Sequence, residues 1–161
     1  MIWFFDRWAV LLIAASFVFA LGSTLAWAGD QTQVELNKKN VVEFCDKAFN
    51  QKDFEAAKVY FGPQFIDHNP AASGDGTKDV EGFKRFLDFL RDKFPQSHFE
   101  IKRVIAVDDY VIVHSHGGVR EPGIRGRAIV DIFRLEGGKV VEHWDVVRDI
   151  PENPRNPHAF F

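Results

Sequence analysis

The stretch that most constrains the fold covers residues 127–148 and reads RAIVDIFRLEGGKVVEHWDVVR. Apolar and polar residues alternate on both sides of Gly137 and Gly138, and a period of two is typical of β-strands. The two glycines suit a tight turn, so the stretch predicts a β-hairpin. Asp131 and His143 lie among its apolar residues. Because burying an unpaired carboxylate is costly, these two residues need an explanation.

The register of this hairpin decides which residue lies opposite Asp131. A three-residue EGG loop with a left-handed glycine places Asp131 opposite His143. A two-residue turn made by the glycines alone places Asp131 opposite Trp144. We favour the first register, because Glu-Gly-Gly suits a type I turn followed by a glycine bulge.

Upstream of these strands the apolar residues follow a helical period. They recur every three or four residues over 34–49 and again over 80–94, which predicts two amphipathic helices. A shorter helix is expected after Asp53, which serves as its N-cap. We expect Asp79 to cap the last helix and Pro95 to end it.

From residue 98 onward the period changes to two. The segment FIDHNP before this point reads as a short extended piece, and AASGDGTKD reads as a loop. Helices followed by a meander of strands predict an α+β domain, with N-terminal helices packed on one face of a strongly curved antiparallel sheet. The predicted strands cover residues 98–107, 109–118, 126–135 and 139–148.

The first 28 residues read as a leader rather than as part of this domain. Arg7 supplies a thin positive region, AVLLIAASFVFAL is an apolar run of signal-peptide length, and Ala26 and Ala28 match a signal-peptidase site. We expect residues 1–28 to be a signal peptide cleaved after Ala28, so that residues 29–161 are periplasmic or secreted, with no membrane span after cleavage. The alternative is an uncleaved anchor, because residues 8–28 carry no charge.

The composition excludes some classes of protein. The chain has a single cysteine, Cys45, so no internal disulfide can form, and its position in a helical apolar pattern predicts a buried thiol. The formal net charge of −3 and the lack of a basic stripe argue against a nucleic-acid partner.

Acid–base residues gather on the predicted strands. Asp131 alternates with apolar residues, and His114 and His116 share one strand face with Tyr110. A carboxylate in apolar surroundings has a raised pKa, and such a carboxylate beside a histidine suits proton transfer near neutral pH. The candidate catalytic residues are Asp131, His116, His114 and His143, and the candidate substrate-binding residues are His68, Tyr110, Phe133 and Trp144.

Structural roles are open for the same residues. A histidine on a strand often binds a backbone carbonyl instead of a substrate. Asp131 would equally form an ion pair with Arg127 or Arg103.

The segment VDIFRLEGGKVVEHWD resembles the C-terminal signature of the SnoaL-like polyketide cyclases, which belong to the nuclear-transport-factor-like superfamily. FIDHNP, FKRFLDFLRDKFP, IKRVIAVDDYVIVHSH and IPENP match in the same order. The resemblance implies a cone whose curved sheet lines a deep, mostly apolar internal pocket. It also implies that Asp131 is the acid–base aspartate and that His116 or His114 is a pocket histidine.

The resemblance implies a reaction class as well. Members of known chemistry close a ring by intramolecular aldol condensation without a metal or an organic cofactor, so we expect no cofactor here. We expect an exported acid–base enzyme of the cyclase, isomerase or hydrolase type that acts on a small hydrophobic carbonyl compound. Because the antibiotic cyclases act in the cytoplasm, its substrate should differ from theirs. The alternative is a non-catalytic exported protein that binds a small apolar ligand.

A metal site is a further hypothesis that the sequence raises. His114 and His116 point the same way on one strand, and Asp131 or His143 would complete a two-histidine, one-carboxylate set. We expect no metal, because histidine pairs on strands are common and the resembled family needs none.

The strands are apolar on both faces, which bears on oligomeric state. Helices cover only one face of the sheet, so the other face would be an exposed apolar patch, and such patches usually mark an interface. We therefore expect a two-fold homodimer formed through the convex face.

Overall fold

The described part of the chain comprises residues 31–69, 79–120, 123, 125–156, 158 and 160–161 of a computed structural model. The chain divides into two compact units, Met1–Gln33 and Val34–Phe161, and the second carries the sheet and the core. The leader, its cleavage site and most of the AASGDGTKD segment lie outside the described residues. Within the described residues, no helix is long and apolar enough to span a membrane.

The helices form where the helical period predicted them. A helix over residues 31–45 continues into the π-helical turn η1 (Asp46–Asn50). The short helix α2 (Phe54–Ala57) leads into the 3-10 turn η2 (Lys58–Tyr60). Its N-cap is Asp53, as predicted, because the Asp53 carboxylate accepts a hydrogen bond from the Ala56 N–H at 3.0 Å. The last helix, α3, spans Asp79–Lys93.

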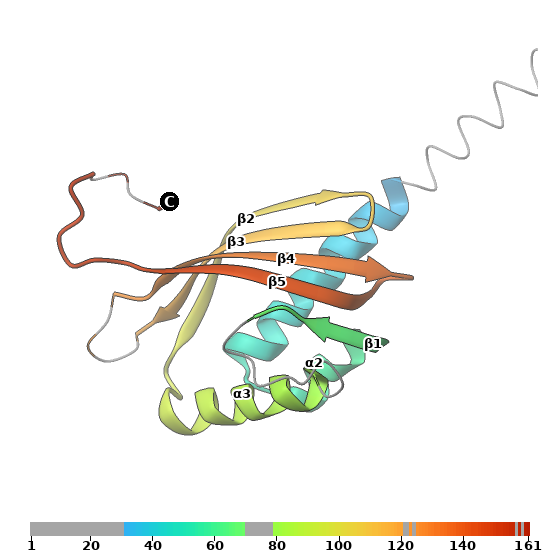
Figure 1. Ribbon diagram of the computed structural model, residues 1–161, viewed down its shortest axis with the longest axis horizontal. Helices are drawn as coiled ribbons and strands as arrows, with labels where there is room; N and C mark the ends of the chain where they lie inside the picture. The colour runs from blue at the N-terminus through green and yellow to red at the C-terminus, as the bar shows by residue number, and fades with distance from the viewer. Residues whose placement is uncertain (1–30, 70–78, 121–122, 124, 157, 159) are drawn as a thin grey trace, which may run out of the picture. The chain divides into compact units, whose positions relative to one another are not determined.

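Five strands form a single mixed sheet in the order β1-β5-β4-β3-β2 (Figure 1). The last four run antiparallel to their neighbours and confirm the predicted meander. The first three residues of the predicted extended piece, 65–67, lie in β1. β1 pairs in parallel with β5, which corrects the expectation of an antiparallel sheet. The strands are β1 (Phe61–Asp67), β2 (His98–Val107), β3 (Tyr110–Val119), β4 (Arg127–Glu136) and β5 (Lys139–Asp149).

The β4–β5 turn contains only Gly137 and Gly138, which have φ values of 55° and 79°. Positive φ at both central residues is typical of a type I′ turn, whose twist matches that of the flanking strands. The three-residue loop that we favoured from the sequence is therefore wrong. The turn pairs Glu136 with Lys139.

A β-bulge at Val141 then shifts the register by one residue, so that Asp131 faces Asp145. Neither predicted partner, His143 or Trp144, is directly opposite Asp131. The bulge buries two successive valines, Val140 and Val141, against the core.

The hydrophobic core lies between the helices and one face of the sheet. Phe44, in the first helix, is its centre, because its ring packs on aromatic rings of η1, η2, β1, α3 and β4. Cys45 beside it is fully buried, as predicted. Two register shifts interrupt the pairing of β2 with β3, and β2 bends visibly along its length (Figure 1). The sheet contributes Val111, Val113, Phe133, Leu135 and Val140 to this core.

Candidate active site

Asp131 points toward the helices and the core. Its carboxylate is on the same face of β4 as Phe133 and Leu135, and only 4% of the residue is exposed. The β3–β4 register places Val113 opposite Asp131 and Ser115 opposite Ile129, so these four residues share that face. Phe133, a predicted substrate-binding residue, lies next to Asp131 on this buried face.

The His143 side chain joins two buried carboxylates, those of Asp131 and Asp67. Its Nε2 atom is 3.2 Å from Asp131 Oδ1, and its Nδ1 atom is 3.0 Å from Asp67 Oδ1. All three side chains are largely buried, with 13% exposure for His143. The Phe133 ring stacks on the imidazole with 4.8 Å between centroids. The predicted pairing of His143 with Asp131 is therefore present, although it is diagonal across the strands.

The two neighbouring carboxylates determine the protonation of His143. Burial lowers the pKa of His143, but the hydrogen bonds and charges of Asp131 and Asp67 outweigh burial and raise this pKa to about 9. A protonated imidazole donates from both ring nitrogens, which matches a carboxylate partner on each side. Burial also raises the pKa of Asp131, although the hydrogen bond and charge of His143 oppose the increase.

One oxygen of Asp131 is left without a partner. Oδ1 is paired with His143, whereas Oδ2 is buried and makes no hydrogen bond within the described part of the chain. A buried carboxylate oxygen of this kind costs free energy unless a ligand or water donates to it. Asp131 therefore presents an acceptor atom of raised basicity on the buried face.

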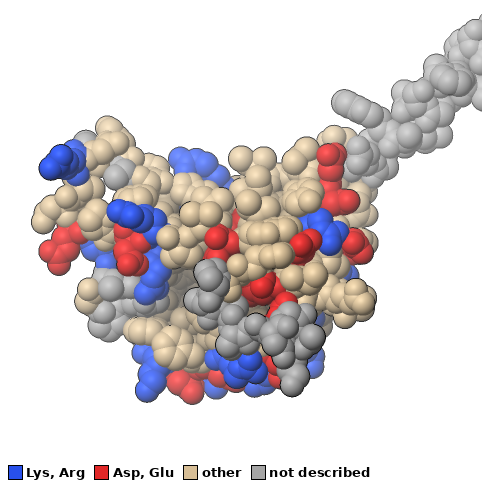
Figure 2. Space-filling model, viewed as in Figure 1, with Lys and Arg blue, Asp and Glu red and all other residues tan. Residues whose placement is uncertain are grey.

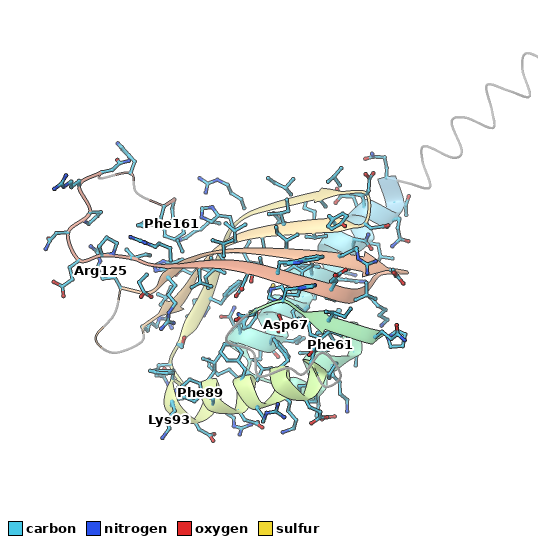
Figure 3. The ribbon with its side chains drawn as sticks, viewed as in Figure 1. Phe61, Asp67, Phe89, Lys93, Arg125 and Phe161 are labelled. Carbon is cyan, nitrogen blue, oxygen red and sulfur yellow. The ribbon has the colours of Figure 1, made fainter. Side chains whose placement is uncertain are left out.

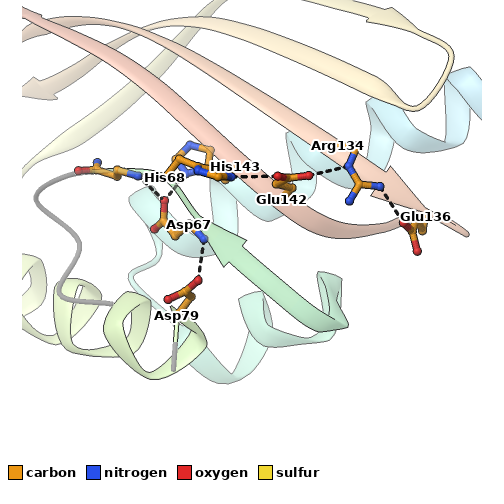
Figure 4. A network of polar contacts seen from close by, with 8 residues as sticks. Asp67, His68, Asp79, Arg134, Glu136, Glu142 and His143 are labelled. Carbon is orange, nitrogen blue, oxygen red and sulfur yellow. Dashed lines mark hydrogen bonds and ion pairs between the residues drawn. The ribbon is translucent and has the colours of Figure 1, made fainter. Parts of the chain in front are cut away.

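Residues that the sequence reasoning missed surround this group. Asp67 ends β1 beside His143, and its backbone N–H donates to Asp79 Oδ2 at 2.8 Å (Figure 4). The Asn69 N–H donates to Asp67 Oδ1, and the Asn69 amide donates to Asp145 Oδ2 at 2.6 Å. The segment FIDHNP contains the sequence signal for these residues, because it has a carboxylate and an amide in addition to the histidine that we selected.

The structure places His114 and His116 on the opposite, outer face of the sheet, together with Tyr110. Alternation along β3 decides this, because Val113 and Ser115 are the residues that share the face of Asp131. The grouping of these two histidines and Tyr110 with Asp131 is therefore wrong.

Both outer-face histidines already have partners within the chain. His114 Nδ1 is 2.9 Å from Arg103 Nη1, and His116 Nε2 is 2.8 Å from the Arg125 carbonyl. The Phe161 ring packs on both imidazoles, on the side of the sheet away from α3, as the positions of Phe161 and Phe89 in Figure 3 show. The C-terminal residue thus tucks back against the domain.

His68 and Trp144 also lie on the outer face rather than in the site. Their rings stack with 4.8 Å between centroids and 2° between planes. His68 Nε2 is 2.9 Å from Glu142 Oε1, and Glu142 pairs in turn with Arg134 (Figure 4). The predictions that His68 guards the mouth of the site and that Trp144 contacts the substrate are wrong, because the bulge in β5 turns Trp144 outward.

The ion pairs of Asp131 with Arg127 or Arg103 that the sequence left open are not formed among the described residues. Arg127 pairs with Asp149 at 3.4 Å, and the Arg103 guanidinium contacts His114. The metal hypothesis required His114 on the face of Asp131, where it does not lie. Among the described residues, no group of three or more His, Cys, Asp or Glu side chains is arranged to hold a metal ion.

Charged side chains of both signs are interspersed on the face that Figure 2 shows. The described residues form no continuous basic area in this view.

Comparisons with known proteins add a family and a fold. A model of the SnoaL-like domain family matches residues 41–143. A loop-truncation variant of IdmH shares 23% identity and a TM-score of 0.58, and the match covers 68% of this chain and 91% of that chain. Wild-type IdmH is named as a candidate polyketide cyclase from Streptomyces antibioticus.

Two further solved structures are similar over comparable lengths. TsrD from Streptomyces laurentii has 19% identity and a TM-score of 0.57, and the match covers 70% of this chain and 88% of that chain. AclR from Streptomyces galilaeus, named as a candidate hydroxylase, has 20% identity and a TM-score of 0.56, with 76% and 91% covered. No curated protein matches the chain. These likenesses show a shared fold.

Proposed function

This chain belongs to the SnoaL-like domain family, and on that premise we propose that it is an acid–base enzyme acting on a small hydrophobic carbonyl compound. The observation that carries the proposal is the buried Asp131 carboxylate, which has one oxygen held by His143 and the other without a partner among the described residues. Burial raises the pKa of this carboxyl, which makes its ionised form a stronger base.

In the proposed step, Asp131 Oδ2 takes a proton from the carbon next to the substrate carbonyl. The C–H bond breaks, its electron pair forms a carbon–carbon double bond, and the carbonyl π pair moves onto oxygen to give an enolate. Attack of the enolate carbon on a second carbonyl of the same molecule closes a ring, and the alkoxide that forms takes the proton back from Asp131. Return of the proton to another carbon instead isomerises the substrate. Both outcomes need only a base and a proton donor, so we propose no cofactor.

His143 and Asp67 serve this step by positioning the base. The imidazolium holds Asp131 Oδ1, which directs Oδ2 away from His143, and Asp67 fixes the ring from its other nitrogen. The positive imidazolium also favours the ionised form of Asp131, which opposes the effect of burial on its pKa.

Deuterium exchange tests the proposal without knowledge of the natural substrate. The purified protein is incubated in D2O with small hydrophobic ketones, and NMR follows the replacement of the protons next to the carbonyl by deuterium. We expect catalysed exchange that Asp131→Asn slows by about 10²–10⁴-fold. Asp149→Asn, which changes an exposed carboxylate paired with Arg127, is the matched control.

Equal exchange rates in the wild type and in Asp131→Asn would refute the assignment of the base. A ligand that co-purifies chemically unaltered, together with no exchange across the ketones, would favour the alternative of a non-catalytic binding protein. Native mass spectrometry of the purified protein identifies such a ligand.

We also propose that the chain is exported and that its leader is removed after Ala28. The support is the apolar run and the small residues of the leader. Mass spectrometry of the protein from the cell envelope and the medium should show an N-terminus at Gly29. Recovery of the intact leader in the membrane fraction would contradict cleavage.

A homodimer formed through the outer face is a further part of the proposal. Ile105, Ile112, Ile132 and Trp144 are consecutive pairing partners across four strands on that face. Ile105 is 58% exposed, and its place in a contiguous apolar row suits an interface. Light scattering should give about twice the monomer mass, and Ile105→Glu should yield a monomer. A wild-type monomer at micromolar concentration would refute the dimer.

A further inference from the structure

Two buried polar atoms on the same face of the sheet have no hydrogen-bond partner. They are Asp131 Oδ2 and the hydroxyl of Ser115, and Ser115 is fully buried. Neither atom has a partner anywhere in the described part of the chain. Buried hydroxyls and carboxylates are normally paired, so two such atoms on one face point to a ligand that pairs with both.

The strand register makes these two residues diagonal neighbours. Val113 lies opposite Asp131 and Ser115 lies opposite Ile129, so the four residues form a square with Ser115 and Asp131 at opposite corners. Diagonal residues of an antiparallel pair are about 7–8 Å apart between Cα atoms, and their side chains approach more closely. Side chains at this separation can contact the carbonyl oxygen and the adjacent carbon of one small molecule.

The neighbouring apolar side chain is directed away from Asp131. The Cδ1 atom of Ile129 lies 2.5 Å from the position that a Cβ atom would take at Gly117. Gly117 pairs with Arg127, on the side of Ile129 opposite to Asp131. Because glycine has no side chain, Ile129 extends over Gly117 instead of over the diagonal between Ser115 and Asp131.

We propose that Ser115 is the second polar residue of the ligand site and that its hydroxyl donates a hydrogen bond to the carbonyl oxygen of the substrate. This inference rests on the proposed function. The serine proton stays on its oxygen throughout, and the hydrogen bond strengthens as negative charge develops on the carbonyl oxygen while Asp131 removes the carbon-bound proton. The ligand class is therefore an apolar ketone or aldehyde with a hydrogen on the adjacent carbon.

A structural role for the hydroxyl predicts a different response to mutation. If the hydroxyl stabilised the fold through a hydrogen bond, its removal would lower the unfolding midpoint. A hydroxyl that is unpaired without ligand costs stability, so Ser115→Ala should leave the midpoint unchanged or raise it. Stability and ligand recognition are therefore separable in one variant.

The test compares binding of acetophenone with binding of ethylbenzene, which has a similar shape but no carbonyl. NMR titration should show roughly tenfold tighter binding of acetophenone to the wild type, and a ratio near one for Ser115→Ala. Ile129→Val is the matched control, because it trims the residue facing Ser115 without removing a polar group. It should weaken both probes alike and keep the ratio.

Three results would overturn the inference: a ratio near one in the wild type, an unchanged ratio in Ser115→Ala, or a marked fall in the unfolding midpoint of Ser115→Ala. The proposed function is judged separately by deuterium exchange. Binding that prefers acetophenone through Ser115, without any exchange, would refute the proton transfer and leave the role of Ser115 in recognition intact. Exchange that needs Asp131 but not Ser115 would support the proton transfer and refute the role of Ser115.

Discussion

The stability of this domain should fall between pH 6.5 and pH 9 because of His143. Its pKa is about 9 in the folded chain against an ordinary value of 6.5, so the folded state holds the proton more tightly than the unfolded state. A group with a raised folded pKa contributes its full stabilisation below the unfolded pKa. That stabilisation is lost as the pH rises through the folded pKa.

The magnitude follows from the difference of about 2.5 between the two pKa values of His143. At about 1.4 kcal/mol per pKa unit, this difference corresponds to about 3 kcal/mol. The free energy of unfolding of a whole domain is typically about 5–15 kcal/mol, so this contribution is a large part of it. With a urea dependence of about 2 kcal/mol per molar, the unfolding midpoint should fall by about 1.5 M across this range.

Urea unfolding at half-unit pH steps, followed by circular dichroism, measures this fall. His143→Gln should lose most of the pH dependence, because the titrating ring is gone. His114→Gln, on the outer face, should retain it and serves as the control. An equal fall in the wild type and in His143→Gln would refute the reasoning, as would an NMR titration that places the pKa of His143 near 6.5.

Other perturbations follow from the same geometry. Asp67→Asn should lower the pKa of His143, because it removes one of the two carboxylates that raise it, and NMR titration of the ring reads this directly. Phe44→Ala should cost about 3–5 kcal/mol in urea unfolding, since its ring is the centre of the aromatic core. Gly126→Ala should cost about 1–3 kcal/mol, because Gly126 has a φ of 83° and an added Cβ would lie 2.7 Å from the Gly117 carbonyl oxygen. Deleting Val141 should lower the thermal unfolding midpoint, because it removes a buried valine, but it should leave His143 opposite Phe133 and its pKa raised, which NMR titration would show.

The strands that pair with their neighbours in sequence were predictable, whereas β1 was not. The period of two and the glycine turn locate β3, β4 and β5 within a residue or two. β1 pairs with β5 through residues that are far apart in the sequence, such as Asp67 and His143. No local pattern encodes such a contact. Asp67 was therefore missed as a site residue even though its segment was recognised as extended.

The choice between the two faces of β3 could not be made from periodicity. Tyr110, Ile112 and the two histidines alternate with Val111, Val113 and Ser115, so both sets contain apolar residues. Because of its two histidines, we assigned the first set to the site, but the second set shares the face of Asp131. The inconspicuous set ends in Ser115 and Gly117, whose small side chains suit a face packed against helices, and that size difference was the available signal.

The bulge at Val141 explains how His143 reaches Asp131 at all. With the glycine turn alone, Ile132 would face His143 and the imidazole would point to the outer face, because a shift of one residue exchanges the two faces of a strand. One extra residue in β5 reverses this, so that His143 and Asp145 turn inward and Trp144 turns outward. Gly62 in β1 makes the bulge possible, since a Cβ there would lie 2.6 Å from the Val141 side chain. The buried carboxylate of Asp131 is thus tolerated because a local irregularity, supported by a glycine on the adjacent strand, supplies its charged partner.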